Sequence, residues 1–358
     1  MHMVRLLVSL LLLTASAAHA CSVPVFRYAL EHWPADPFQI TVFHRGTMSD
    51  AQRAMIPADK LANAKVRTVD LATETADDVL DLWRQQKTET LPWVLVRFPQ
   101  VTGITAPVIA GPLAEMAPHL FESAVRKEVI ERLAAGESAV WVLLESGDKA
   151  KDDAAAALVE KRLEYLMGVM TLPKLDEQDI VNGLVSIAEE DLRLEFSILR
   201  VSRDDPGEKA FVRMLLTTEP DLGSLREPMV FPIFGRGRAL YALVGAGIRH
   251  ETIEEAASFL IGKCSCQIKE RNPGVDLLLN ADWTTLIKTP PDLARQLPTL
   301  AEVSSAAPVS VTATPKAAEA AAPNSERSPL WLLAIVYGVS PLFLGLAIIL
   351  LLKAKRRR

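Results

Sequence analysis

The sequence predicts an α/β protein made of two similar globular units and one C-terminal membrane-spanning helix. Two observations support this prediction. Apolar strands alternate with amphipathic helices in the same order twice between residues 22 and 268. An uncharged apolar run then covers Leu330–Leu352, which is longer than the ~20 residues needed to cross a ~30 Å hydrocarbon core. We therefore expect a folded body that is held at a membrane by its C-terminal end.

The N-terminal end has the features of a secretory signal peptide, residues 1–20. Arg5 supplies the positive charge, Leu6–Leu13 the apolar core and Ala18–Ala20 the cleavage site. A second membrane helix is the alternative, but the apolar run is short for one. Cleavage at this site would make Cys21 the first residue, so a lipoprotein is a further alternative, although the residues before Cys21 match a lipidation signal poorly.

The C-terminal end determines the expected topology. The anchor region, residues 329–352, is followed by residues 353–358, which carry five positive charges. Because basic residues stay on the cytoplasmic side, the chain before the anchor should lie in the periplasm or outside the cell. Residues 301–328 are rich in Ala, Pro, Ser and Thr without periodicity, which predicts a flexible linker.

Composition limits the class of protein further. The 358 residues have net charge −5, and Arg5 and the tail account for six positive charges, which leaves −11 for the exported part. An acidic exported part argues against nucleic acid as a partner. With only three cysteines, Cys21, Cys264 and Cys266, no disulfide framework holds the fold. The core must therefore form by apolar packing.

The first unit is expected to cover residues 21–136. Its β-branched and alternating runs predict strands at Phe38–Phe43, Val66–Leu71, Leu91–Phe98 and Ala106–Ala110. Helical spacing and capping residues predict helices at Val23–Trp33, from Asp50 to about Ala64, from Thr75 to about Gln86, and at Leu113–Ala134. Pro57 should kink or shorten the second of these helices.

The second unit is expected to cover residues 137–300 and repeats the order of elements. Strands are predicted at Ser138–Leu144, Leu184–Ala188, Leu192–Val201, Pro228–Phe234 and Ala239–Val244. Helices are predicted from Lys149 to about Met167, at Glu208–Thr217, and from a Thr252 cap through Leu260. The segment Val275–Leu279, apolar except for Asp276, should pack back on this unit. The shared order suggests a duplication.

The order strand–helix–strand–helix–strand–strand–helix, with Pro92 before the third strand, resembles the thioredoxin fold. The layout as a whole is similar to tandem thioredoxin-like proteins of the disulfide-isomerase type. This resemblance implies that Pro92 is cis and faces the active site, and that active members carry Cys-x-x-Cys after the first strand. Here the loops are His44–Ser49 and Glu145–Asp148, which contain no cysteine. Both copies should therefore be inactive as oxidoreductases, because that chemistry needs a thiolate there.

His44 takes the place of the nucleophile region in the first loop. A polar residue at a strand end is the plainer interpretation of His44. Non-catalytic copies of this fold serve as binding or scaffolding units, so the resemblance implies that kind of role.

The sharpest local motif is Cys264-Ser-Cys266. The pair suits copper(I) or a strained, reducible disulfide, and one of the two could instead form a structural disulfide with Cys21. Inert thiols are the remaining alternative. Zinc prefers four ligands, and the four histidines of the exported part show no ligand spacing. We therefore name Cys21, Cys264 and Cys266 as candidate metal ligands, Cys264 and Cys266 as candidate catalytic residues, and copper as the one cofactor to consider.

The leading hypothesis is an exported, membrane-anchored, non-catalytic binding or scaffolding protein with a protein partner in an envelope complex. The chain lacks phosphate-loop, dinucleotide, nucleophile-elbow and zinc-protease motifs, so no enzyme class is favoured. The alternative is a thiol-redox or copper-handling protein that uses Cys264 and Cys266.

Overall fold

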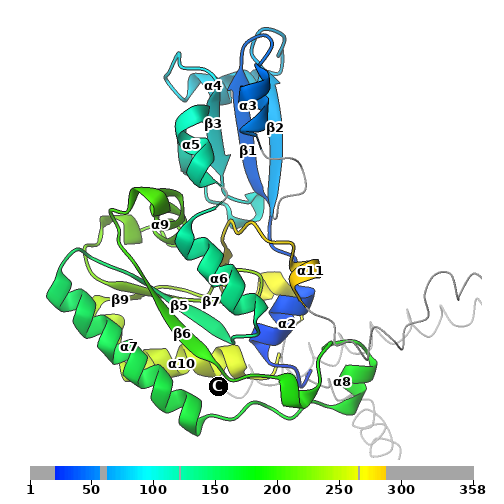
Figure 1. The fold of residues 1–358 in the computed structure, drawn as a ribbon, viewed down its shortest axis with the longest axis vertical. Helices are drawn as coiled ribbons and strands as arrows, with labels where there is room; N and C mark the ends of the chain where they lie inside the picture. Colours follow the sequence, from blue (N-terminus) through cyan, green and yellow to red (C-terminus); the bar gives the residue numbers. More distant parts are fainter. Residues whose placement is uncertain (1–20, 57–62, 121, 265–266, 288–358) are drawn as a thin grey trace, which may run out of the picture. The chain divides into compact units, whose positions relative to one another are not determined.

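The computed structural model describes residues 21–56, 63–120, 122–264 and 267–287 (Figure 1). These residues form a mixed α/β structure with two mixed sheets, as the sequence predicts. The predicted signal peptide, linker, anchor and tail lie outside the described residues, as does Cys266. Within the described ranges, no helix combines the length and the hydropathy that crossing a membrane requires.

The first sheet has strand order β2-β1-β3-β4. Its strands are β1 (Phe38–His44), β2 (Ala64–Asp70), β3 (Trp93–Arg97) and β4 (Pro107–Pro112), and its helices are α3 (Asp50–Ala54), α4 (Asp77–Arg84) and α5 (Leu113–Leu120). β1 pairs in parallel with β2 and antiparallel with β3, and β3 pairs antiparallel with β4. All four strands predicted for the first unit are thus confirmed.

The second sheet has strand order β10-β8-β7-β5-β6, with β9 also paired to β7. Its strands are β5 (Ala139–Leu144), β6 (Phe196–Val201), β7 (Met229–Phe234), β8 (Arg238–Ala239), β9 (Leu243–Val244) and β10 (Val275–Asp276). Its main helices are α7 (Lys149–Val169), α9 (Lys209–Leu215) and α10 (His250–Ile261). As in the first sheet, the first strand lies between a parallel second strand and an antiparallel third strand.

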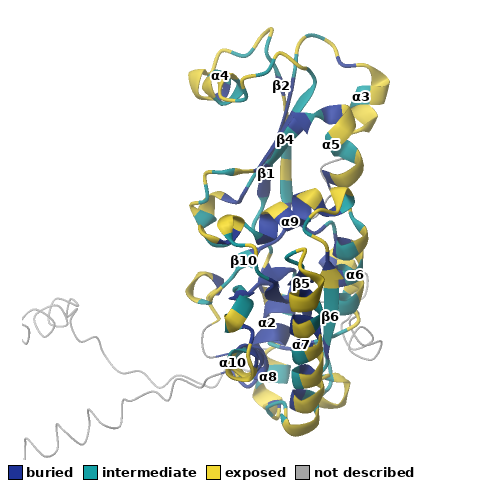
Figure 2. Cartoon of the chain, turned by 90° about the vertical axis from the view of Figure 1, so that its left-hand side faces the viewer, coloured by how far each residue is buried: buried dark blue, intermediate teal, exposed yellow. Residues whose placement is uncertain are grey.

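The second sheet is covered on both faces, which explains why β5 is apolar and buried at every position (Figure 2). Because successive side chains of a strand point to opposite faces, Trp141 and Leu143 pack with α7, α10 and α2 (Val25–His32). Val140 and Val142 pack on the other face, with α9 and α6 (Ala124–Ala134).

Helix α2 packs on the second sheet, although the sequence analysis assigns it to the first unit. The backbone of Pro24 forms an antiparallel bridge with Lys263, and Val25 N donates to Gly262 O over 2.9 Å. The packing is close, because a Cβ built on Gly235 would lie only 2.8 Å from Ala29 Cβ. A glycine is therefore needed at position 235, where φ is +58°.

The single helix predicted at Leu113–Ala134 is two helices, α5 and α6. Pro118 lies inside α5, and Ser123 caps the start of α6. Arg126 stabilises the break, because its guanidinium donates to Leu120 O over 3.0 Å and to His119 O over 2.6 Å. These are carbonyls of the last turn of α5, which have no partner inside that helix. Arg126 is 1% exposed, and burial lowers its pKa to about 10.

Two predicted helix starts and one predicted helix end differ from the structure. α4 begins after Ala76 without a side-chain cap, and Glu74 accepts from the N–H groups of Thr75 and Ala76 just before it. α10 begins at His250 with Arg249 as its N-cap, so Thr252 lies inside the first turn. α3 keeps its predicted Ser49 capping box but ends at Ala54, before Pro57.

The prediction of a strand at Leu184–Ala188 is wrong. These residues form turns and bends after α8 (Glu177–Val181), and Leu184 N donates to Asp179 O over 2.9 Å. The strand predicted to begin at Leu192 begins only at Phe196, where its pairing with β5 starts. A short apolar run without an edge to pair with does not form a strand.

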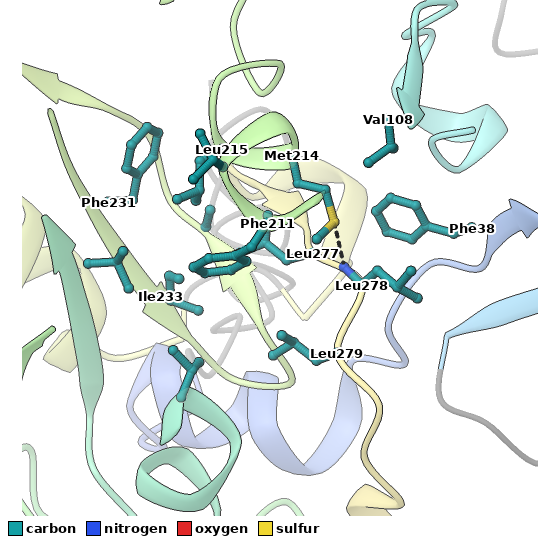
Figure 3. Close-up of a cluster of buried hydrophobic side chains, with 14 of the residues drawn as sticks. Phe38, Val108, Phe211, Met214, Leu215, Phe231, Ile233, Leu277, Leu278 and Leu279 are labelled. Carbon is teal, nitrogen blue, oxygen red and sulfur yellow. Dashed lines mark hydrogen bonds between the residues drawn. The ribbon is translucent and has the colours of Figure 1, made fainter. Parts of the chain in front are cut away.

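One apolar cluster joins both sheets (Figure 3). Phe38 and Val108 of the first sheet belong to the same cluster as Phe211 of α9 and Phe231 of β7. The segment Leu277–Leu279 lies in it, and Leu278 N approaches Met214 Sδ at 3.2 Å. Figure 3 shows this segment beside both Phe38 and Phe211.

A buried ion network lies next to this segment. Asp276 Oδ1 accepts from Arg238 Nη1 over 2.9 Å, and its other oxygen accepts from Lys269. Lys269 Nζ also lies 2.9 Å from Asp36 Oδ1, and Asp36 N donates to Asp276 Oδ2 over 2.6 Å. The network therefore connects the residues before β1 with β8 and β10. Burial raises the pKa of Asp36, and its hydrogen bond to Lys269 opposes the shift.

We predict that Asp276→Asn lowers the free energy of unfolding by about 3 kcal/mol, because it leaves two buried cations without their shared carboxylate. Chemical denaturation of the purified full-length chain measures this. Glu251→Gln is the control, since Glu251 is 76% exposed in its pair with Arg249 and should contribute less than about 1 kcal/mol. Equal stability of the two variants would show that the network contributes little.

Glu137 gives a pH-dependent prediction. Burial raises the pKa of Glu137 above its ordinary 4.5, and the hydrogen bond from Ser197 opposes this. The folded state therefore holds this proton to higher pH than the unfolded state, and wild-type stability falls as pH rises through that window. We expect Glu137→Gln to match wild type below pH 4.5 and to melt at higher temperature than wild type at neutral pH. A constant difference across pH would contradict this.

Candidate functional site

The loop after β1 is closed by its own hydrogen bonds. His44 Nδ1 lies 2.8 Å from Gly46 O, and Gly46 N donates to Asp70 Oδ1 over 2.9 Å. Asp70 also accepts from Ala72 N over 2.9 Å, and these two bonds, that from Ala72 first, lower its pKa. The side chain of His44 is thus used within the loop, as in the plainer interpretation of this residue.

Pro92 lies at the same edge of the first sheet. The Leu91–Pro92 peptide bond is cis, as the resemblance implies, and Pro92 O accepts from Leu113 N over 2.9 Å. Because Phe43 of β1 pairs with Trp93 of β3, the register places Pro92 beside the end of β1. The structure therefore brings His44 and Pro92 together, two residues that are 48 positions apart in the sequence.

The loop after β5 is also closed, in this case by a buried carboxylate. Asp152 of α7 is 2% exposed. It accepts from Ser146 N over 2.8 Å, from Ser146 Oγ over 2.9 Å and from Gly147 N over 3.1 Å. These three donors replace the water molecules that the carboxylate would bind if it were exposed. Asp152 therefore holds the loop in place. Nothing in the sequence around Asp152 indicates this role.

Cys21 and Cys264 lie on paired segments. Cys264 N donates to Val23 O over 2.9 Å, and the two side chains belong to the same buried cluster, with 4% and 1% exposure. Burial raises the pKa of the Cys21 thiol, the nearby Asp179 adds to the shift, and a hydrogen bond from the backbone of Val23 partly opposes it. Since the thiolate is the nucleophile, these surroundings make Cys21 a poor one.

Tyr28 of α2 lies near both cysteines. Burial is the main cause that raises the pKa of the Tyr28 hydroxyl, and the charges of Cys264 and Cys21 raise it further. The structure thus brings the N-terminal segment to the end of α10, as the prediction of a structural link between them requires. The third predicted site residue, Cys266, lies outside the described residues.

The described residues contain no group of three or more His, Cys, Asp and Glu side chains that could hold a metal ion. The histidines of the predicted exported part, for which the sequence shows no ligand spacing, lie apart in the fold. His32 Nε2 lies 3.0 Å from Leu184 O, and the backbone carbonyl of His119 accepts from Arg126. His250 is the exposed first residue of α10.

A cavity of about 870 Å³ lies between Val101–Ala106 and the residues after α9. Asp36, Arg238 and Lys269 on its wall belong to the buried ion network, and Glu219 accepts from Ala242 N over 2.9 Å. These groups are thus already engaged in holding the fold.

The chain is a mixed α/β protein with two mixed sheets, and in each sheet the first strand lies between a parallel second strand and an antiparallel third strand. No protein-family model, curated protein or solved structure matches it.

We predict that Cys21 reacts with iodoacetamide about tenfold or more slowly in the folded chain than in denaturant, because burial limits both access and ionisation. A variant with Cys264→Ala and Cys266→Ala leaves Cys21 as the one thiol, and mass spectrometry follows its labelling. Similar rates in the folded and denatured chains would show that Cys21 is accessible.

Proposed function

We propose that this chain is an exported, membrane-anchored, non-catalytic binding or scaffolding protein built on two degenerate thioredoxin-like units. One observation carries the proposal. At both positions where thiol chemistry would require cysteines, the loop is held by its own hydrogen bonds, through Asp70 after β1 and Asp152 after β5. Loops of this kind are built to stay in one conformation and offer no thiolate.

The shared connectivity of the two sheets supports the thioredoxin-like part of the proposal. In each sheet the first strand has a parallel and an antiparallel neighbour, and helices follow the first, second and fourth core strands. This is the order of elements from which the resemblance is drawn. Two units with one order are also what a duplication would leave.

The shared core supports the binding or scaffolding part. Residues of both sheets contribute to one apolar cluster, and the ion network of Asp276 reaches the residues before β1. A body with a common core presents its surfaces in a defined arrangement, which reduces the entropy lost when a partner binds. The expected partner is another protein of the envelope, and the membrane anchor predicted at residues 329–352 would keep the two at the same membrane.

The proposal predicts that the full chain in detergent reduces insulin and reactivates scrambled ribonuclease no faster than buffer does. A thioredoxin of known activity is the positive control. Turnover that disappears on Cys264→Ser would overturn the proposal and assign the activity to the cysteine motif. Turnover that persists in that variant would overturn it as well and would point to another group.

The alternative is a thiol-redox or copper-handling protein, and the pairing of the Cys21 segment with the Cys264 segment favours it. Its test is direct. Stoichiometric copper after anaerobic incubation with copper(I) and dialysis, lost on Cys264→Ser, would support this alternative. Resistance of the cysteines to mild reductant together with no copper would leave the binding role as the better account.

A further inference from the structure

Arg203 lies two residues after β6 and carries a guanidinium that the described residues leave largely unsatisfied. Its Nε and Nη1 atoms are buried, and no atom of the described chain accepts a hydrogen bond from either. Its Nη2 atom reaches only a sulfur, Met229 Sδ, at 3.9 Å. Leaving buried N–H donors without acceptors is costly. Arg97 and Arg162 each leave only Nε in this condition, so Arg203 is the extreme case among the described residues.

The side chains around Arg203 are mostly positively charged. A cavity of about 510 Å³ is lined by four basic side chains, those of Arg203, Lys209, Arg213 and Arg226. Among the described residues that line it, Asp204 is the one carboxylate; Asp204, Lys209, Arg213 and Arg226 are exposed, and Arg203 is half-buried. Burial lowers the pKa of Arg203 and the charge of Arg226 lowers it further, while Asp204 and Asp152 oppose the shift.

Neither acid compensates the positive charge fully. Asp152 already accepts three hydrogen bonds from Ser146 and Gly147, and no hydrogen bond joins it to Arg203. The cavity therefore has an excess of positive charge. A cavity with that excess is complementary to an anion.

The position of the cavity also suits a ligand. Arg203 follows the carboxyl end of β6, whose last residue, Val201, accepts from Glu145 N at the end of β5. Arg226 precedes β7, whose first residue, Met229, pairs with Leu144 of β5. In open α/β sheets, ligands bind outside the carboxyl ends of the parallel strands. Apolar side chains of β4, Val108 and Ile109, line another wall, and the volume is in the range of small-molecule sites.

We propose that Arg203 and Arg226 bind the oxyanion group of a small ligand, a phosphate or a carboxylate, in this cavity. A guanidinium presents five N–H donors in a fixed plane, and its hydrogen bonds to ionised oxygens are among the strongest in proteins. The anion would balance the positive charge that Arg203 and Arg226 bring to the cavity, and it would screen the two guanidiniums from each other. The apolar wall of β4 leaves room for a compact apolar part of the ligand. This inference is independent of the proposed binding or scaffolding role.

The test uses the full-length chain and two probes, inorganic phosphate and succinate, each titrated at constant ionic strength. Calorimetry measures affinity, and the melting temperature is followed in parallel. We expect at least one probe to bind the wild-type chain and to raise its melting temperature. Arg203→Gln and Arg226→Gln should each weaken that affinity about tenfold or more. Arg249→Gln is the matched control, because Arg249 is 60% exposed and lies outside the cavity.

A second measurement separates a binding role for Arg203 from a structural one. Without either probe, Arg203→Gln should be as stable as wild type or more stable, because it removes a buried charge that has no acceptor. A phosphate response alone would identify a phosphorylated ligand, and a succinate response alone a carboxylate ligand. A wild-type chain indifferent to both probes would overturn the proposal, as would variants that bind as tightly as Arg249→Gln. If Arg203→Gln fails to fold, Arg226→Gln decides the outcome by the same criteria.

Discussion

The fold depends on the segment that follows Gly274, because this segment takes part in both sheets' cores. Asp276 closes the buried ion network with Arg238 and Lys269, and Leu277–Leu279 enter the apolar cluster that joins the sheets. Asn63, just before β2, donates to Leu277 O over 2.9 Å. Buried charges of this kind are tolerated only when each has its partners, and here the carboxylate of Asp276 accepts from both cations. The two sheets are therefore held by one strand end and the few residues after it.

The strands were predictable because their signal is local. The alternation in Phe38–Phe43 and the continuous apolar run in β5 each report the burial of a strand's own faces, and both strands are present. The element against which a buried face packs can lie far away in the sequence, so local periodicity does not identify it. The periodicity of α2 shows that one side is buried, but it cannot show that this side packs on the second sheet, more than 100 residues further along the chain. The break between α5 and α6 had a visible signal in Pro118, whereas the buried Arg126 that stabilises it looks like any surface arginine in the sequence.

The same distinction applies to the site. Cysteine motifs and loops without cysteine can be read directly, so Cys21, Cys264 and the two loops were identified from the sequence. Asp152 and Arg203 were not, because acidic and basic residues near helix and strand ends are ordinary in soluble surfaces. Only the structure shows that Asp152 is buried with three donors and that Nε and Nη1 of Arg203 are buried without an acceptor.

The cationic side chains with buried atoms differ in one respect: for some of them the fold supplies hydrogen-bond acceptors, and for Nε and Nη1 of Arg203 it does not. Arg126 donates to carbonyls of α5, and Arg238 and Lys269 share Asp276, so each is explained by the fold itself. Removing their partners would only weaken the fold. Arg203 has no such explanation: the fold buries its Nε and Nη1 atoms, places Arg226 nearby and supplies no acceptor to either atom. Since an unpaired buried charge destabilises a protein, its presence at the carboxyl end of β6 is better explained by a bound anion than by packing.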